Sequence, residues 1–489
     1  MSTPRTPPPL AGGTQGPHDL RPLLGIALDA LRDGAAARRG PLPAGGPDAV
    51  TQRVHAAAHP VLPDHGTGAE HALRTLVHAL AEGAADPADP LCAAHLHCPP
   101  LAVAAAADLA ASALNASMDS WDQAPAASTL EALVTHAIAT QIHPEGDALI
   151  TTGGTESNQL ALLLAREAAT RHGPVRGPVQ LLVGDNAHHS LARAAWLLGL
   201  PEPIAVPAPA GTLDPAALDE ALTELGGPPR QFLVAATAGT TDAGLIDPLD
   251  DIADLCAAHD ARLHVDAAYG GGLLFSDTRK HHLRGIERAD TVTLDLHKLG
   301  WQPAAAGIIA ARDPRDLDAL THRADYLNAD DDTEAGLPDL LGRSLRTTRR
   351  PDILKIAVTL KALGRSGLGA LVDQVCDQAA EFADLVDAHP AFELYDTPAI
   401  STVLFRPTRA DDHHIAHVRR TLLTEGTAVL GRADLDGCRW LKATLLNPHT
   451  RPDDLAALLK LVELVEPVEP VEPVEAAPQP TPPEGSTPR

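Results

Sequence analysis

Between residues 148 and 312, short apolar runs alternate with longer stretches whose apolar residues recur at helical spacing. Helical patterns such as Ser157–Arg171 and Pro248–His259 separate several of the runs. Strands that are joined through helices lie parallel in one sheet, with the helices packed on its faces. The chain is therefore predicted to form an α/β fold around a mainly parallel central sheet with helices on both faces. The expected strands are Leu149–Thr152, Val179–Val183, Pro203–Val206, Phe232–Ala236, Arg262–Asp266, Thr291–Leu294 and Gly307–Ala310.

The sequence on either side of this region has a different character. Residues 1–20 are rich in Pro, Gly and Thr, which favours disorder, and residues 21–140 contain Ala-rich amphipathic runs typical of helices. We expect a large domain over residues 141–365 and a smaller α+β domain over residues 366–463. One long helix over Arg350–Ala388, with a break near Gly367, would connect the two domains.

The last residues, 464–489, contain a tandem Val-Glu-Pro repeat from Val465 to Glu475. Proline at every third position prevents both helix and sheet, because proline lacks a backbone N–H and has a fixed φ. We therefore expect this tail to be disordered, with no role in catalysis.

Charge and cysteine content limit the possible partners. The formal net charge of the 489 residues is −26 at pH 7, which disfavours nucleic acid and anionic membranes. No apolar stretch approaches the roughly 18 residues of a membrane helix, and the Pro-rich, polar N-terminus has no charged region followed by an apolar run, so we expect neither membrane insertion nor secretion. The five cysteines are odd in number and lack metal-ligand spacing, which predicts free thiols, no metal site and a cytoplasmic location.

Two strand ends carry the residues with the most informative chemistry. Asp266 ends the run Arg262–Asp266, and Lys298 lies beside His297 just after the run Thr291–Leu294. Ligands of open parallel sheets bind beyond the carboxyl ends of the strands. An acid that can pair with a ring nitrogen and an amine that can form an imine are what a pyridoxal phosphate enzyme requires. Either residue alone would more simply be a turn aspartate or a solvated lysine.

A glycine turn follows the first expected strand. The sequence there is Thr151-Thr-Gly-Gly-Thr-Glu-Ser-Asn158, and it opens a helical pattern. Gly153 and Gly154 let the backbone approach an anion, while the N–H groups and the dipole at the helix start favour a phosphate near Thr155. The simpler interpretation is an ordinary glycine turn with a threonine cap.

Three further side chains follow strand ends. His188 could stack on a flat ring and contact a substrate carboxylate, although a lone histidine at a strand end is more often structural. Thr237 could contact a ring hydroxyl, and Ala268 is small enough to lie against a ring face. The ordered combination of these groups with Asp266 and Lys298 carries the prediction, because each signal alone is weak.

These motifs resemble those of the group II pyridoxal phosphate-dependent decarboxylases, which include aromatic amino acid, glutamate, lysine and diaminobutyrate decarboxylases. The resemblance covers about residues 85–460 and implies a type I aminotransferase-like fold, pyridoxal 5'-phosphate as cofactor, and an intertwined homodimer to which residues 21–140 contribute. By this resemblance Lys298 would be bonded to the cofactor aldehyde, Asp266 would pair with the pyridine nitrogen, and His188 would stack on the ring. The motifs that carry it are Gly153–Asn158, Ala187-His188, Thr237–Thr241, His264–Tyr269 and His297-Lys298.

The segment Ala324-Asp-Tyr-Leu-Asn328 also matches the family. In the family, a loop tyrosine at this place returns a proton to the substrate carbon after carbon dioxide leaves. The resemblance therefore implies that Tyr326 is catalytic together with Lys298 and His188, although a surface anchor is the alternative. The tyrosine favours simple decarboxylation over aldehyde formation.

Substrate choice is indicated by His95–Pro100 and Asn115–Gln123, which resemble the diaminobutyrate and lysine branch. We expect L-2,4-diaminobutyrate as the amino acid substrate, with lysine or ornithine next. Asp119 and Asp122 could pair with a distal ammonium, although both could be surface-loop residues. Gly300 stands where the branch has an aromatic residue, and it is expected to leave a gap in the pocket.

Other functions remain open from the sequence. The same chemistry would serve an aromatic or acidic amino acid decarboxylase. A pyridoxal phosphate lyase or an aldehyde synthase would use the cofactor without simple decarboxylation. A non-catalytic assembly protein acting through its acidic tail would leave the Asp266 and Lys298 motifs unexplained.

Overall fold

The central element is a seven-stranded sheet with the strand order β1-β7-β6-β5-β4-β2-β3. The computed structural model describes residues 7–170, 177–226, 231–321, 331, 334–338 and 340–466. All seven expected strands are present, each within two residues of its expected bounds. They are β1 (Asp147–Thr151), β2 (Val179–Gly184), β3 (Ile204–Val206), β4 (Gln231–Thr237), β5 (Arg262–Ala267), β6 (Thr291–Asp295) and β7 (Gly307–Ala311).

The sheet is mainly parallel, as predicted. Parallel pairing joins β3 to β2, β2 to β4, β4 to β5 and β5 to β6. The exception is β7, which runs antiparallel to both of its neighbours, β6 and β1. As a result, β1, β2, β4, β5 and β6 all end at the same edge of the sheet, and residues far apart in the sequence meet there.

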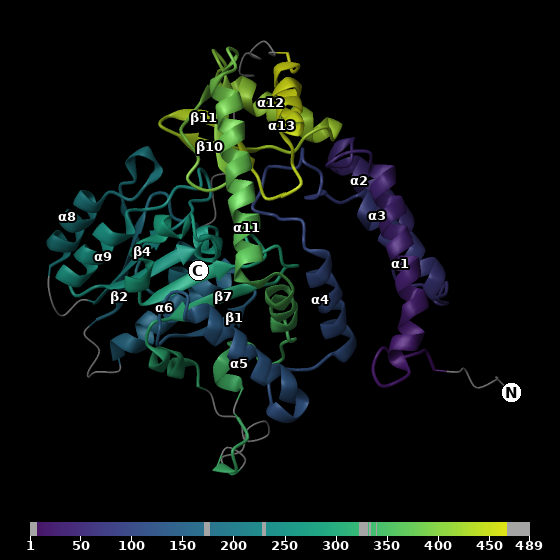
Figure 1. The fold of residues 1–489 in the computed structure, drawn as a ribbon, viewed down its shortest axis with the longest axis horizontal. Coiled ribbons are helices and arrows are strands. Elements are labelled where there is room, and N and C mark those ends of the chain that lie inside the picture. The colour runs from purple at the N-terminus through teal and green to yellow at the C-terminus, as the bar shows by residue number, and fades with distance from the viewer. Residues whose placement is uncertain are drawn as a thin grey trace, which may run out of the picture.

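Helices cover both faces of the sheet, as expected (Figure 1). On one face, α6 (Gly154–Thr170) through Leu162 and α7 (Ser190–Leu197) through Leu191 share an apolar cluster with Leu181 and Leu233 of the sheet. The other face buries Ile150 and Val234 in the largest apolar core of the described residues. The helices on that face include α5 (Pro125–Ala139), α8 (Pro215–Leu225) and α9 (Leu249–Ala258).

A long helix, α11 (Ile353–Asp387), runs from the central sheet to the small domain (Figure 1). It bends at Gly364, whose φ is 66°, three residues before the expected break at Gly367. Glycine adopts positive φ without the steric cost that a Cβ imposes. The sequence offers several glycines here, and only the packed structure selects which one carries the bend.

The small domain is α+β, as predicted. Its antiparallel sheet has the order β10-β11-β9-β8, and Phe382 of α11 packs against Phe405 and Leu441 in its core. The strands are β8 (Phe392–Leu394), β9 (Thr402–Pro407), β10 (Gly431–Leu435) and β11 (Cys438–Thr444). The covering helices are α12 (Asp412–Glu425) and α13 (Pro452–Glu463). The repeat tail lies almost entirely outside the described residues.

The N-terminal helices form an arm on one side of the molecule, beyond α4 (Ala102–Leu114) in the view of Figure 1. The expectation of disorder up to residue 20 is wrong at its end, because α1 begins at Gly16. Pro17 lies in the first turn, where a backbone N–H would have no acceptor within the helix. The N–H that proline lacks is therefore not needed there, and the Pro-rich composition does not prevent a helix. The arm consists of α1 (Gly16–Arg38), α2 (Gly46–Ala58) and α3 (Ala69–Glu82).

The arm is poorly covered by the rest of the described chain. Neither α2 nor α3 contains a buried residue, and Leu28 and Leu80 are 64% and 71% exposed. Within the described ranges, no helix combines the length and the apolar character needed to cross a membrane.

Candidate active site

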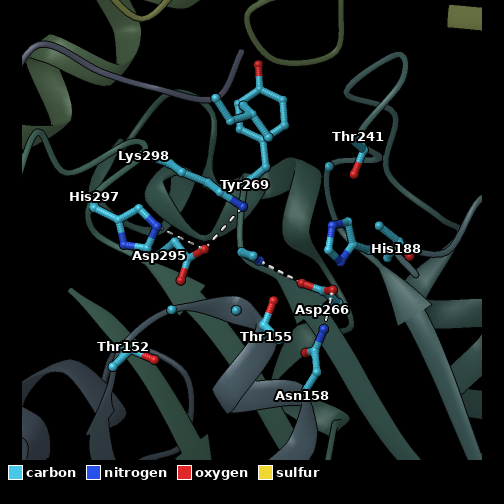
Figure 2. A pocket seen from close by; sticks show the side chains of 16 residues that line it. Thr152, Thr155, Asn158, His188, Thr241, Asp266, Tyr269, Asp295, His297 and Lys298 are labelled. Atoms are coloured by element: carbon cyan, nitrogen blue, oxygen red, sulfur yellow. Dashed lines mark hydrogen bonds and ion pairs between the residues drawn. The ribbon is translucent and has the colours of Figure 1, made fainter. Parts of the chain in front are cut away.

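A cavity of about 320 Å³ lies at the edge where the parallel strands end (Figure 2). All of the predicted cofactor-binding residues line it, although they come from five different strand ends. These residues are Gly153, Gly154, Thr155, His188, Thr237, Asp266, Ala268, His297 and Lys298. The predicted proton donor, Tyr326, lies outside the described residues.

Lys298 is paired with a carboxylate that the sequence reasoning did not single out. Its Nζ is 3.1 Å from Oδ2 of Asp295, the last residue of β6. The Nε2 of His297 lies 3.6 Å from the same oxygen, and burial lowers the pKa of His297. In Figure 2 a dashed line joins the Lys298 amine to Asp295. An acid three residues before a lysine, at the end of a buried strand, is the signal that could have revealed this pair.

Asp266 is held by a network of buried donors. Its Oδ2 accepts from Nδ2 of Asn158 at 2.7 Å, and its Oδ1 accepts from the backbone N–H of Ala268 at 3.1 Å. The Oδ1 of Asn158 in turn lies 3.0 Å from both Thr293 Oγ1 and His264 Nε2. Burial lowers the pKa of His264 to about 4, so its ring is neutral at pH 7 and can donate through Nε2. The network therefore fixes which way the Asn158 amide points.

His188 is joined to the same network. Its Nδ1 is 2.8 Å from Ser190 Oγ and accepts from the Ser190 backbone N–H at 3.3 Å. Burial lowers the pKa of His188, which favours the neutral ring. Because Nδ1 accepts, the proton of that neutral ring lies on Nε2. Asn158 also donates to Ser190 Oγ at 2.9 Å, so one amide orders both His188 and Asp266.

The glycine turn at the start of α6 leaves little room for side chains. A Cβ on Gly153, whose φ is 152°, would lie 3.0 Å from Cε1 of His297. A Cβ on Gly154 would lie 3.0 Å from the Cβ of Ala268. The exposed backbone and the N-terminus of a 17-residue helix thus meet the cavity together, an arrangement that favours an anion.

The residues present fit pyridoxal phosphate. The Oγ1 of Thr237 is buried at the cavity wall and has no hydrogen-bond partner among the described residues. A buried hydroxyl of this kind calls for a polar partner from a bound group. The turn at Gly154 can bind a phosphate, Asp266 can pair with a ring nitrogen, and Lys298 can form an imine with an aldehyde. Asn158 and Asp295 were missed by sequence reasoning, although both lie within or beside the quoted motifs.

The gap expected at Gly300 and the surface position considered for Asp119 are both wrong. Gly300 leaves no gap, because a Cβ there would lie 2.5 Å from the backbone oxygen of Leu296. Asp119 is not a surface residue: it is 6% exposed and accepts from Gln123 Nε2 at 2.7 Å. Neither Asp119 nor Asp122 lines the cavity.

Residues 55–408 match the family model described as the pyridoxal-dependent decarboxylase conserved domain. The chain belongs to this family. Membership confirms the resemblance, the pyridoxal phosphate cofactor and the enzyme class, an amino acid decarboxylase.

Known decarboxylases of this family cover most of the chain. The L-2,4-diaminobutyrate decarboxylase of Rhizobium meliloti (strain 1021) is 42% identical, over 81% of this chain and 82% of that protein. The enzyme of the same name from Acinetobacter baumannii is 32% identical, over 81% and 83%.

A solved structure shares the fold. It is the glutamate decarboxylase domain of the diaminobutyrate-pyruvate transaminase and L-2,4-diaminobutyrate decarboxylase from Vibrio parahaemolyticus, which is 32% identical. It superimposes with a TM-score of 0.83, over 93% of this chain and 96% of that chain. The likeness confirms the fold predicted for this decarboxylase.

Proposed function

We propose that this decarboxylase converts L-2,4-diaminobutyrate into 1,3-diaminopropane and carbon dioxide. The observation that carries this substrate is the 42% identity to the Rhizobium meliloti enzyme over 81% of this chain. The motifs His95–Pro100 and Asn115–Gln123, which resemble the diaminobutyrate branch, support the same choice. Lysine and ornithine, which also carry a distal ammonium, are the next substrates to consider.

The positions of the cavity residues support a role for each of them. When bound, pyridoxal phosphate supplies a ring that withdraws electrons from the substrate carbon. We assign Lys298 as the amine bonded to the cofactor and Asp266 as the partner of its pyridine nitrogen. Gly153, Gly154 and Thr155 would hold the phosphate. Thr237 would donate to the ring hydroxyl, and Ala268 leaves space for the ring face.

Binding and orientation decide which bond of the substrate breaks. A neutral His188 has its Nε2–H free for the substrate carboxylate, because Ser190 occupies Nδ1. A substrate carboxylate held at His188 would be oriented for decarboxylation in preference to other reactions of the same cofactor. In this proposal, His188 or Tyr326 then delivers a proton to the substrate carbon.

A substrate panel tests the proposal. Purified enzyme with added pyridoxal phosphate is given diaminobutyrate, ornithine, lysine, glutamate and tyrosine, and the amine products are measured by mass spectrometry. We expect the fastest product to be 1,3-diaminopropane. Faster release of carbon dioxide from glutamate or tyrosine would overturn the proposed substrate. Borohydride reduction followed by peptide mapping should place the cofactor on Lys298.

Tyr326→Phe tests the identity of the proton donor. If Tyr326 donates the proton, the variant should release more aldehyde and peroxide per amine than the unmodified enzyme. An unchanged product ratio would leave His188 as the donor.

We also propose that the enzyme is a cytoplasmic homodimer. The apolar side chains exposed on α1–α3, which include Leu28, Leu31, Leu76 and Leu80, support dimerisation, because burial against a partner would remove them from water. All five cysteines are free thiols, which suits a reducing compartment.

A further inference from the structure

Asp295 occupies a buried position beside Lys298 and His297 at the end of β6. Its side chain is 3% exposed, and Oδ2 contacts both Lys298 and His297. Its other oxygen, Oδ1, is buried with no hydrogen-bond partner among the described residues. A buried carboxylate is costly unless cations and donors offset its charge, so this position indicates a specific use.

The same carboxylate lies against the glycine turn of α6. A Cβ on Gly154 would be 3.2 Å from Asp295 Oδ2, and a Cβ on Gly153 would be 3.7 Å from Oδ1. A phosphate at this turn would therefore meet a second negative charge nearby. Lys298 and His297 are the cationic or basic groups that contact Asp295, and both also line the cavity.

We propose that Asp295 is a positioning residue for Lys298: it binds the Lys298 amine as an ammonium whenever that amine is not bonded to the cofactor. The inference rests on the proposed assignment of Lys298 as the cofactor-bound lysine. Its consequence is that the displaced lysine is held in place and cannot compete with the substrate amine. An ammonium has no lone pair, so it is not a nucleophile.

The substrate amine would replace the Lys298 amine on the cofactor, and the protons of the two nitrogens can be accounted for. With the cofactor bound, Lys298 Nζ would give up its bond to the cofactor as the substrate nitrogen forms the equivalent bond. The substrate arrives as an ammonium and must lose a proton before its nitrogen can attack. Two of its three N–H protons would end on Lys298 Nζ, which carries one proton in its protonated bond to the cofactor, so the lysine would leave as an ammonium that donates a hydrogen bond to Asp295 Oδ2.

Asp295→Asn tests this role, because it keeps the shape and removes the charge. Loss of an adjacent anion lowers the pKa of a cationic nitrogen by about 1 to 3 units. We expect the pH midpoint of the visible absorbance of the lysine-bound cofactor to fall by a similar amount. We also expect the KM for diaminobutyrate to rise by about tenfold or more, with a smaller change in kcat, since a freed lysine amine competes with substrate.

The chain offers a matched control in Asp352→Asn. Asp352 pairs with Lys355 at the same spacing of three residues and at 3.2 Å, and both side chains are buried outside the cavity. This control should lower the thermal midpoint and leave the pH midpoint and KM unchanged. Asp295→Glu retains the charge and should keep a pH midpoint near that of the unmodified enzyme.

Two outcomes would overturn the role of Asp295. One is an Asp295→Asn enzyme with the pH midpoint and KM of the unmodified protein. The other is an Asp295→Glu enzyme in which the pH midpoint of the visible absorbance falls by a full unit. This second outcome decides the question if the Asn variant does not fold. Failure of the underlying assignment is distinguished by borohydride mapping of the unmodified enzyme, which would then label a lysine other than Lys298.

Discussion

Asn158 connects the two groups that face the proposed ring, Asp266 and His188. It donates to Asp266 at 2.7 Å and to Ser190, the partner of His188, at 2.9 Å. Asn158→Asp would place a carboxylate oxygen against Asp266. A lost hydrogen bond to a charged group costs about 1.5–3 kcal/mol, so we expect the affinity for pyridoxal phosphate to fall about 10- to 100-fold. Titration of the cofactor into apoenzyme, followed by absorbance, measures this change.

Asn186→Asp is a suitable comparison for that experiment. Asn186 donates to Asp247 at 2.7 Å, so the substitution creates the same conflict away from the cavity lining. It should reduce stability and change cofactor affinity much less. Equal affinities of the two variants would show that Asn158 has no special role in positioning Asp266.

The sequence predicts the residues that would react or pair with the cofactor better than it predicts the residues that position them by hydrogen bonds. Lys298 and Asp266 were identified because an amine and an acid at strand ends have few alternative explanations in combination. The contact between Asn158 and Asp266 spans 108 residues and depends on the order of strands in the sheet. Gly300 was misjudged for the same reason, since only the folded chain shows how tightly it packs against Leu296.

Tyr269 links the cavity wall to a strand of the small domain. Its hydroxyl is 2.8 Å from Ser401 Oγ and 3.0 Å from Thr402 Oγ1, and its side chain is buried. Tyr269→Phe leaves these two buried hydroxyls short of a partner, which costs about 1–3 kcal/mol. We expect the free energy of unfolding to fall by about that amount, measured by urea denaturation.

Tyr395→Phe provides the comparison for Tyr269. The hydroxyl of Tyr395 donates to Asp436 at 2.9 Å in a contact exposed to water. An exposed bond of this kind contributes little, so the loss should be below about 0.5 kcal/mol. A larger effect from Tyr395 than from Tyr269 would contradict the proposed link between the domains.

Element types were predictable, whereas local bends and ends were not. Apolar runs such as Arg262–Asp266 are short and bounded by turns, which indicates strands, and the helical patterns between them predict parallel order. The bend at Gly364 and the helix start at Gly16 depend on which of several permitted positions packs best. The sequence permits those positions without choosing among them.

At the scale of the whole molecule, the arm of α1–α3 predicts association. Replacing Leu28 and Leu80 together by glutamate places charges on two exposed apolar positions of the arm. Burying such charges in a dimer interface is unfavourable, so we expect monomers in place of dimers by light scattering. Leu464→Glu, at a residue 67% exposed beyond α13, should leave the dimer intact. Dimers that persist in the double variant would exclude this face of the arm as the interface.

Buried histidines make the stability of the whole fold depend on pH. Burial lowers the pKa of His143 and of His264 to about 4 from 6.5. Between these values the unfolded chain binds protons that the folded chain does not, so stability falls as the pH falls from about 6.5 to 4. For the fully buried His264, this loss amounts to about 3 kcal/mol at the acid end, with no contribution from it above pH 7.

Urea denaturation across this pH range, for the unmodified protein and for His143→Leu, isolates the effect of one ring. His143 is the better choice, because His264 also donates to Asn158 and its loss would disturb the site. Leucine cannot be protonated, so the variant should gain stability relative to the unmodified protein as the pH falls below 6.5. A constant difference between the two proteins from pH 7 to pH 4.5 would mean that His143 titrates alike in the folded and unfolded chains.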